Sequence, residues 1–257
     1  MSESVANERV TNDAPRIERV RHELKRRQLT VARVERYAPQ MLRVVFTGEQ
    51  LDGFTSLGFD DHVKLFFAGG AMRDFTPRRY DARTRELWID FFLHEAGPAA
   101  TWASQAAPGQ SLEVGGPKGS AVISLDGIDT HVLIGDETAV PAIARRLEEL
   151  PAGTRAQVFV ESDHGVQWLA FASKASVTVT WVPREGRVGA PAQELIEALR
   201  KIPFSPGSSF FWVAVETQAA RAIRRYLREE RGIDKDWIKA AGYWQRGAVG
   251  AHERIDE

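Results

Sequence analysis

The spacing of hydrophobic runs changes near residue 127, and this change constrains the fold more than any other feature of the chain. The residues before it form short apolar runs, rich in Val, Leu and Phe, bounded by turn residues such as Ala38-Pro39 and Gly69-Gly70. Five or six strands at this spacing, with few helices between them, are typical of an antiparallel barrel. We expect the strands at residues 29–34, 41–47, 62–67, 87–93 and 111–114.

Beyond residue 127, strand-like and helix-like segments alternate. The run at 132–134 is continuously apolar, as expected of a strand covered on both faces. Alternating strands and helices indicate a parallel, doubly wound sheet. We expect strands at 132–134, 156–160, 177–182 and 210–215, and helices at 139–150, 191–201 and 218–231.

The chain is therefore predicted to hold two domains, which its 257 residues accommodate. The first is an antiparallel β-barrel over residues 28–125. The second is a doubly wound α/β domain over residues 128–250, with a C-terminal extension to 257. Residues 1–27 are expected to form a polar tail followed by a short charged helix at 16–27.

Charge and composition exclude several classes of function. The net charge of −1 gives no electrostatic case for a nucleic-acid partner or an anionic membrane. The chain has no cysteine, which excludes disulfides, thiolate-held iron–sulfur clusters and a thiol nucleophile. No run reaches about 18 apolar residues, so we expect no membrane insertion and a cytoplasmic location. Nothing in the sequence predicts an oligomeric state.

One short segment gathers the side chains that a flavin dinucleotide needs. Arg73 and Arg78 flank Phe75 and Thr76. A guanidinium binds phosphate oxygens through two parallel hydrogen bonds, and an aromatic ring can lie offset against a flavin. A hydroxyl or a backbone N–H can serve a ring atom of the flavin. Taken alone, the segment also fits an exposed loop with charged residues.

A helix start follows this segment. Gly97 and Pro98 precede an expected helix at 99–106, and Pro is favoured at the first helical position. The start exposes unpaired N–H groups at the positive end of the helix, where an anion could bind. A well-made helix start without a ligand is equally compatible with these residues. His94, just before it, could carry a proton, although a lone histidine beside a strand end is more often structural.

In their order and spacing these segments resemble the siderophore-interacting proteins, which are FAD-dependent ferric-siderophore reductases within the ferredoxin-reductase superfamily. The resemblance spans roughly residues 28–255. The matching segments are Asp61-His-Val-Lys64, Arg73-x-Phe-Thr-x-Arg78, Leu87-x-Ile-Asp-Phe-x-Leu-His94, Gly97-Pro-Ala-x-x-Trp-Ala103, Pro108-Gly109, Gly115-Gly-Pro117, Gly135-Asp-Glu-Thr-Ala-Val-Pro-Ala142, Glu216 and Gly242-Tyr-Trp-x-Arg-Gly247.

The resemblance implies a barrel that holds FAD and a second domain that receives NADPH or NADH. By this resemblance Arg73 contacts the pyrophosphate, and Phe75 and Thr76 contact the flavin. The implied cofactor contacts are Arg73, Phe75, Thr76, Arg78, Asp90, Phe92, Leu93, His94, Gly97, Pro98, Ala99, Ala100 and Thr101 in the barrel, and Asp136, Glu137, Thr138, Arg184 and Glu216 in the second domain. The chain departs from the family where Phe75 replaces the usual Tyr, Ala100 a frequent Ser and Val215 a Gly.

The loop after the first strand of the second domain takes the place of a phosphate loop, yet it carries Asp136 and Glu137 and lacks the glycine pattern of such loops. Two carboxylates would repel a pyrophosphate, so we expect Thr138 to cap the helix with the acids at its positive end. Glu161 ends the next strand, where an acid favours NADH, whereas Arg184 could take the 2′-phosphate of NADPH. The residues leave this choice open, and the resemblance favours NADPH.

Ferric siderophores are often anionic, so a pocket for them calls for cationic side chains. The resemblance implies basic residues around the substrate, matched here by Lys64 and Arg246, with His131 in place of a third and charged only near or below neutral pH. The expected function is an NAD(P)H-dependent, FAD-containing ferric-siderophore reductase that releases Fe(II), in which no side chain is the catalytic acid or base. A general flavin-dependent electron carrier and a non-catalytic siderophore-binding protein stay open as alternatives.

Overall fold

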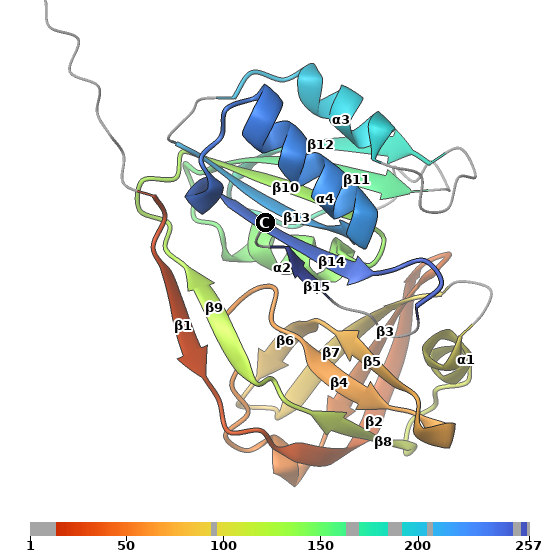
Figure 1. Cartoon of the computed structure of the whole chain (residues 1–257). Helices are drawn as coiled ribbons and strands as arrows, with labels where there is room; N and C mark the ends of the chain where they lie inside the picture. Colours follow the sequence, from red (N-terminus) through yellow and green to blue (C-terminus); the bar gives the residue numbers. More distant parts are fainter. Residues whose placement is uncertain are drawn as a thin grey trace, which may run out of the picture.

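The chain folds into two halves, each built on its own sheet, with a two-stranded ribbon running alongside them (Figure 1). The structure is a computed structural model that describes residues 14–93, 97–162, 170–184, 192–204, 208–248 and 253–255. Within these residues, no helix is long and apolar enough to cross a bilayer.

The first half is a seven-stranded antiparallel sheet in the order β5-β4-β8-β2-β3-β7-β6. Its strands are β2 (Arg26–Ala38), β3 (Met41–Thr47), β4 (Val63–Phe66), β5 (Met72–Phe75), β6 (Pro77–Asp81), β7 (Glu86–Phe92) and β8 (Ser111–Gly115). The edge strands β5 and β6 are separated in the chain by Thr76 alone, so the two edges must meet. The sheet therefore curls into a partly closed barrel, and Thr76 lies at the seam.

Helix α1 (Pro98–Ser104) covers one part of the barrel. Its Trp102 packs on Phe46, Phe67 and Phe91, with ring centroids 6.0, 6.0 and 5.8 Å away. This aromatic contact joins the helix to the barrel core and fixes the direction in which the helix begins.

The second half is a six-stranded sheet in the order β12-β11-β10-β13-β14-β15, parallel except for β15. Its strands are β10 (Thr130–Asp136), β11 (Arg155–Ser162), β12 (Ser176–Pro183), β13 (Ser209–Glu216), β14 (Ile238–Trp244) and β15 (Glu253–Ile255). Helix α2 (Val140–Glu149) covers the face toward the barrel, and α3 (Gln193–Arg200) and α4 (Thr217–Arg225) cover the other (Figure 1). A π-helical segment (Tyr226–Glu230) extends α4, and short 3-10 turns occupy Glu49–Leu51, Ala68–Gly70 and Lys235–Trp237.

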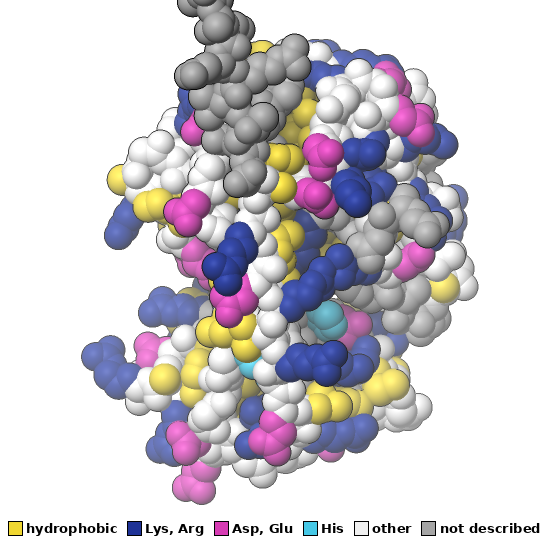
Figure 2. All heavy atoms as spheres, turned by 60° about the vertical axis from the view of Figure 1, so that its left-hand side comes forward, with side chains coloured by type: hydrophobic (Ala, Val, Ile, Leu, Met, Phe, Trp, Pro, Cys, Tyr) yellow, Lys and Arg dark blue, Asp and Glu magenta, His cyan; other side chains and the backbone are white. Residues whose placement is uncertain are grey.

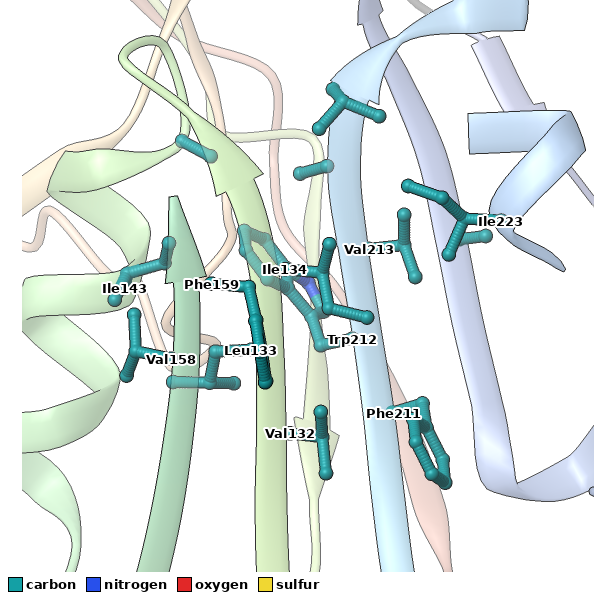
Figure 3. Close-up of a cluster of buried hydrophobic side chains, with 14 of the residues drawn as sticks. Val132, Leu133, Ile134, Ile143, Val158, Phe159, Phe211, Trp212, Val213 and Ile223 are labelled. Atoms are coloured by element: carbon teal, nitrogen blue, oxygen red, sulfur yellow. The ribbon is translucent and has the colours of Figure 1, made fainter. Parts of the chain in front are cut away.

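Side chains on both faces of this sheet are buried, as the continuous apolar runs predict. All eight residues of β13 are buried. Figure 3 shows Ile143 of α2 beside Val158 at one side of the core, and Ile223 of α4 beside Val213 at the other.

The ribbon pairs β1 (Ile17–Arg21) with β9 (Gly119–Ile123) in antiparallel register. The expected helix at 16–27 is therefore wrong. Backbone pairing with a distant segment outweighs the local charge pattern here, and Gly119 permits the close approach, since a Cβ on it would lie 2.6 Å from the carbonyl oxygen of Val20.

Polar side chains join the two halves. Asp60 of the barrel accepts hydrogen bonds from Trp212 Nε1 at 2.8 Å and from Lys239 Nζ at 2.9 Å. Arg145 of α2 reaches across to the barrel and donates to the hydroxyl of Ser56 and to the carbonyl of Pro77, at 2.8 and 2.9 Å. These bonds connect residues up to 179 positions apart in the chain and fix the halves against each other.

Gly242 of β14 gives a direct test of how closely this sheet packs on α4. A Cβ at this position would lie 2.3 Å from Oγ1 and 2.8 Å from Cα of Thr217, so backbone atoms would have to move. We expect Gly242→Ala to lower the free energy of unfolding by about 3 kcal/mol in urea denaturation. The control Gly153→Ala adds a Cβ in open space at a φ of +90° and should cost only about 1 kcal/mol. Equal losses in the two variants would contradict this packing.

Candidate functional site

The segment that contains Arg73 crosses the barrel seam. Arg73 lies on β5, half-buried, and its guanidinium donates to the carbonyl of Met72 at 2.7 Å. Among the residues that the structure describes, no carboxylate forms an ion pair with Arg73. A partly exposed guanidinium without a carboxylate partner can bind an anionic group from outside the chain.

Phe75 and Thr76 lie next along the same segment. The ring of half-buried Phe75 packs on Phe91, with centroids 4.5 Å apart and planes at 43°. Thr76 is buried, and its side chain is hydrogen-bonded to that of Tyr243 on β14. Burial, followed by the negative charges of Asp60 and Asp136, raises the pKa of Tyr243 well above its usual value, so the phenol stays neutral. The seam of the barrel and the second half of the molecule therefore meet at Thr76.

Arg78 and Asp90, two of the expected cofactor contacts, instead have protein partners in the structure. The buried guanidinium of Arg78 forms two hydrogen bonds with Glu148 of α2, one of them at 2.8 Å and the other to Oε1. Asp90 accepts from Arg43 at 2.7 and 2.8 Å and from Tyr37 at 3.1 Å. Both side chains therefore support the barrel wall and its contact with α2.

The helix start after β7 has the expected form. Gly97 has a φ of +134°, a conformation that favours glycine, and Pro98 occupies the first turn. The first helical bond runs from the N–H of Thr101 to the carbonyl of Gly97, which leaves the amides of Ala99 and Ala100 without helical partners. Phe92 and Leu93 lie just before this start, where Leu93 N–H donates to Gln40, and His94 lies outside the described residues.

The loop after β10 is organised by Asp136, and the expectation for Thr138 is wrong. The helix begins after Ala139 without a side-chain cap. Instead, Asp136 Oδ1 accepts from the N–H of Thr138 at 2.9 Å and from its hydroxyl at 2.5 Å, and Oδ2 accepts from Trp244 Nε1 at 2.8 Å. Burial and the neighbouring charge of Glu137 raise the pKa of Asp136.

Arg184 does not have the freedom that binding a 2′-phosphate would need. It is buried between two carboxylates, with 2.5 Å to Glu137 Oε2 and 3.0 Å to Glu161 Oε2. These three side chains lie at the carboxyl ends of β10, β11 and β12. Burial raises the pKa of Glu161, while the ion pair with Arg184 opposes that rise. The loop thus has a structural ion-pair cluster where a phosphate loop would bind pyrophosphate.

Glu216 caps α4. Its Oε2 accepts from the N–H groups of Gln218 and Ala219 at 2.6 and 3.1 Å, and its Oε1 accepts from the N–H of Arg246 at 3.4 Å. The side chain expected to contact the cofactor therefore stabilises the helix and positions the segment that carries Arg246.

The three expected substrate cations lie in different surroundings. Lys64 is partly exposed on β4, and its ammonium forms an ion pair with Asp74 at 2.8 Å. Arg246 is exposed just after β14. His131 is 1 % exposed and packs edge-on against Phe210 beside Arg146, so its expected contact with substrate is wrong. Successive side chains of β10 point to opposite faces of the sheet, and His131 lies on the face that α2 covers.

His131 predicts a pH-dependent stability. Burial, followed by the charge of Arg146, lowers its pKa from 6.5 to about 3, and neither ring nitrogen has a hydrogen-bond partner among the described residues. Between pH 6.5 and 3 the unfolded chain binds a proton that the folded chain does not, so stability falls as the pH falls through this window and is unaffected above it.

Relative to His131→Phe, the wild-type protein should therefore lose up to about 1.4 kcal/mol of unfolding free energy per pH unit between pH 6 and pH 4. Urea denaturation at several pH values measures this. Parallel pH profiles for the two proteins would contradict a neutral, buried His131.

Comparison with known proteins gives consistent matches over nearly the whole chain. Residues 128–247 match the sequence family described as siderophore-interacting protein, and residues 30–71 and 68–121 match the siderophore-interacting FAD-binding domain. The chain is 34 % identical to the NADPH-dependent ferric-chelate reductase of Escherichia coli K12, over 91 % of this chain and 98 % of that protein. It is 32 % identical to the ferric vibriobactin reductase ViuB of Vibrio cholerae, over 86 % and 90 %.

Solved structures give the same result. A siderophore utilization protein from T. fusca superposes with a TM-score of 0.82 at 35 % identity, covering 92 % of this chain and 98 % of that one. The Amycolatopsis cytochrome P450 reductase GcoB, at 18 % identity and a TM-score of 0.60, shares the fold over 87 % of this chain and 70 % of its own. The chain thus has the fold of the ferredoxin reductases, and it belongs to the siderophore-interacting protein family.

Proposed function

We propose that this protein is an NAD(P)H-dependent reductase of ferric siderophores that works through bound FAD. The observation that carries the proposal is the group formed by Arg73, Phe75 and Thr76 at the barrel seam, with Tyr243 of the second half against Thr76. It offers a cation, an aromatic face and a hydroxyl at a place where both halves of the molecule meet. The names of the matched family and relatives support the same function.

The residues at the seam fit FAD. Arg73, which has no ion pair in the described part of the chain, would hold the pyrophosphate. The amides of Ala99 and Ala100, which have no partner within the helix, would add neutral donors to the same group. Phe75 would lie along the ring system, and Thr76 would orient it. FAD, when bound, takes two electrons from NAD(P)H and passes them on one at a time.

The second half would place the reductant beside this site. Its ion-pair cluster of Glu137, Glu161 and Arg184 keeps the loop after β10 closed to phosphate. Neutral Tyr243 lies against Thr76, and Trp244, the next residue, is held by its hydrogen bond to Asp136. The net reaction is NAD(P)H plus two Fe(III) chelates giving NAD(P)⁺, a proton and two Fe(II).

The substrate would be an anionic ferric chelate, and Lys64 and Arg246 would supply its cationic contacts. Lys64 is partly exposed although it pairs with Asp74, and Arg246 is exposed on the segment that Glu216 positions. Reduction lowers the charge of the iron, which weakens its bonds to hard oxygen donors and favours its release. A cytoplasmic location accords with a cysteine-free chain and a nicotinamide reductant.

The proposal is tested by anaerobic turnover of the FAD-loaded protein with NADPH or NADH, a ferric catecholate siderophore and a chromogenic Fe(II) chelator. We expect two Fe(II) to form for each NAD(P)H oxidised, and no Fe(II) without FAD. A parallel reaction with an oxidised protein acceptor should be much slower. Faster reduction of the protein acceptor, or no Fe(II) from any ferric chelate, would contradict the proposal.

A further inference from the structure

A groove of about 500 Å³ lies between β1 and the strands β14 and β15. Its lining is strongly basic. The charged residues that line it are Arg19, Arg224, Lys235, Lys239 and Arg254, with Asp236 as the acid. The lining therefore has five cationic side chains and one acid in a chain whose net charge is −1, although Asp60 pairs with Lys239, and Arg224 and Arg254 also have interactions within the protein.

Two of these cations have no counter-charge in the described part of the chain. Arg19 on β1 and Lys235 in the turn before β14 are exposed, and the structure records no ion pair for either. Lys239 differs, because its ammonium lies 2.6 Å from Asp60. Like charges gathered in one groove repel each other, and a bound anion would relieve that repulsion.

Apolar side chains also line the groove. Ile17, Ile238 and Ile255 contribute to its lining, and the last two are only 9 % and 5 % exposed. Figure 2, which brings the β1 side forward, shows Lys and Arg side chains beside a band of hydrophobic side chains, with Asp and Glu side chains among them. An inorganic ion would use the cations alone, whereas a molecule with both a charged group and an apolar group would use the whole groove. The volume lies within the range of about 300–1,000 Å³ found for small-molecule sites.

The groove is separate from the proposed reductase site. Lys239 precedes Tyr243 by four residues on β14, which places the two positions about 13 Å apart along the strand. None of the residues that line the groove belongs to the barrel seam.

We propose that this groove binds a soluble organic phosphate, with the phosphate held by Arg19 and Lys235 and the apolar part resting on Ile17, Ile238 and Ile255. A phosphate is favoured over a single carboxylate because it carries more charge and can take a forked pair of bonds from Arg19. The site brings together β1, at one end of the described chain, and β14 and β15 at the other, so its ligand should also stabilise the fold. This proposal is independent of the reductase function.

The test uses FAD-loaded protein and 1-naphthyl phosphate as the probe, with titration calorimetry as the measurement. We expect saturable binding at one site, and binding about tenfold weaker in the double variant Arg19→Ala/Lys235→Ala, which removes two charge-assisted contacts. The matched control Arg83→Ala/Lys201→Ala removes the same charge from exposed positions elsewhere and should bind like the wild type. Uncharged 1-naphthol should bind weakly and equally to all three proteins.

A second measurement follows the melting temperature, which the probe should raise in the wild type and in the control variant but much less in the groove variant. The proposal is overturned if the wild-type protein does not bind the probe at millimolar concentration. It is also overturned if the groove and control variants lose affinity equally, because binding would then lie elsewhere or depend on net charge alone. Association with phosphatidylglycerol vesicles through Arg19 and Lys235, without binding of the soluble probe, would likewise contradict it.

Discussion

Replacing Arg73 with alanine is expected to lower the affinity for FAD by roughly a hundredfold, or about 3 kcal/mol, so that the purified variant is nearly colourless. Arg73 has no carboxylate partner in the described residues, and its loss removes the one free cation of the seam segment. Fluorescence titration of the apoprotein with FAD measures the change. Because Arg73 is half-buried and makes only a local hydrogen bond, the variant should keep its fold.

Arg79→Ala is the matched control for Arg73→Ala. Arg79 lies on β6, close in sequence, but it is exposed and lies over the ring of Trp88 at 4.9 Å. FAD affinity within about twofold of the wild type is expected for this variant. If both variants bound FAD equally well, the role proposed for Arg73 would be wrong.

Asp60→Ala should lower the free energy of unfolding by about 3–4 kcal/mol, at least as much as Gly242→Ala. The substitution leaves Trp212 Nε1 and the ammonium of Lys239 without their acceptor, and both lie between the two halves of the molecule. A partly buried donor that loses its partner keeps its desolvation penalty, which is why the loss exceeds that of an exposed pair. Urea denaturation followed by tryptophan fluorescence measures it.

Two further variants calibrate that result. Asp60→Asn keeps an acceptor for Trp212 but removes the charge, so its loss should be intermediate. Asp81→Ala removes an acid at the end of β6, where its Oδ1 accepts from the N–H groups of Arg83 and Thr84 at 2.9 and 3.3 Å, and its loss should be much smaller than that of Asp60→Ala. A loss in Asp60→Ala no larger than in Asp81→Ala would show that Asp60 does not hold the halves together.

The fold class follows from the sequence because period and spacing of apolar residues are local properties. The strand at 41–47 and the run of eight buried residues in β13 lie where those patterns predict them. The helix predicted at 16–27 is wrong for a physical reason, since the backbone partner of this segment is β9, about a hundred residues away. Strands β5 and β6 are short, and no local pattern shows that they form the two edges of the sheet. These edges meet at Thr76 only because the sheet closes.

Part of the candidate site could also be predicted from the sequence, and part could not. The cluster of Arg73, Phe75 and Thr76 could be predicted because its members lie close together on one segment. The pairing of Arg78 with Glu148, and of Arg184 with Glu137 and Glu161, joins residues that no spacing rule connects. Asp60 gave no sequence signal, because a single acidic residue has the same sequence pattern whether it is exposed to solvent or joins the two halves of the molecule. Tyr243 could be found only through the Gly-Tyr-Trp motif, and its contact with Thr76 depends on how the halves dock.

The proposed function depends on FAD lying at the barrel seam, where NAD(P)H can reduce it. The decisive measurement is the visible absorbance spectrum of the FAD-loaded wild-type protein under anaerobic conditions, recorded before and after NADPH or NADH and then after a ferric siderophore. We expect the flavin absorbance to be bleached by a nicotinamide and restored by the ferric siderophore. A protein that retains no FAD, or a bound flavin that neither nicotinamide bleaches, would refute this function.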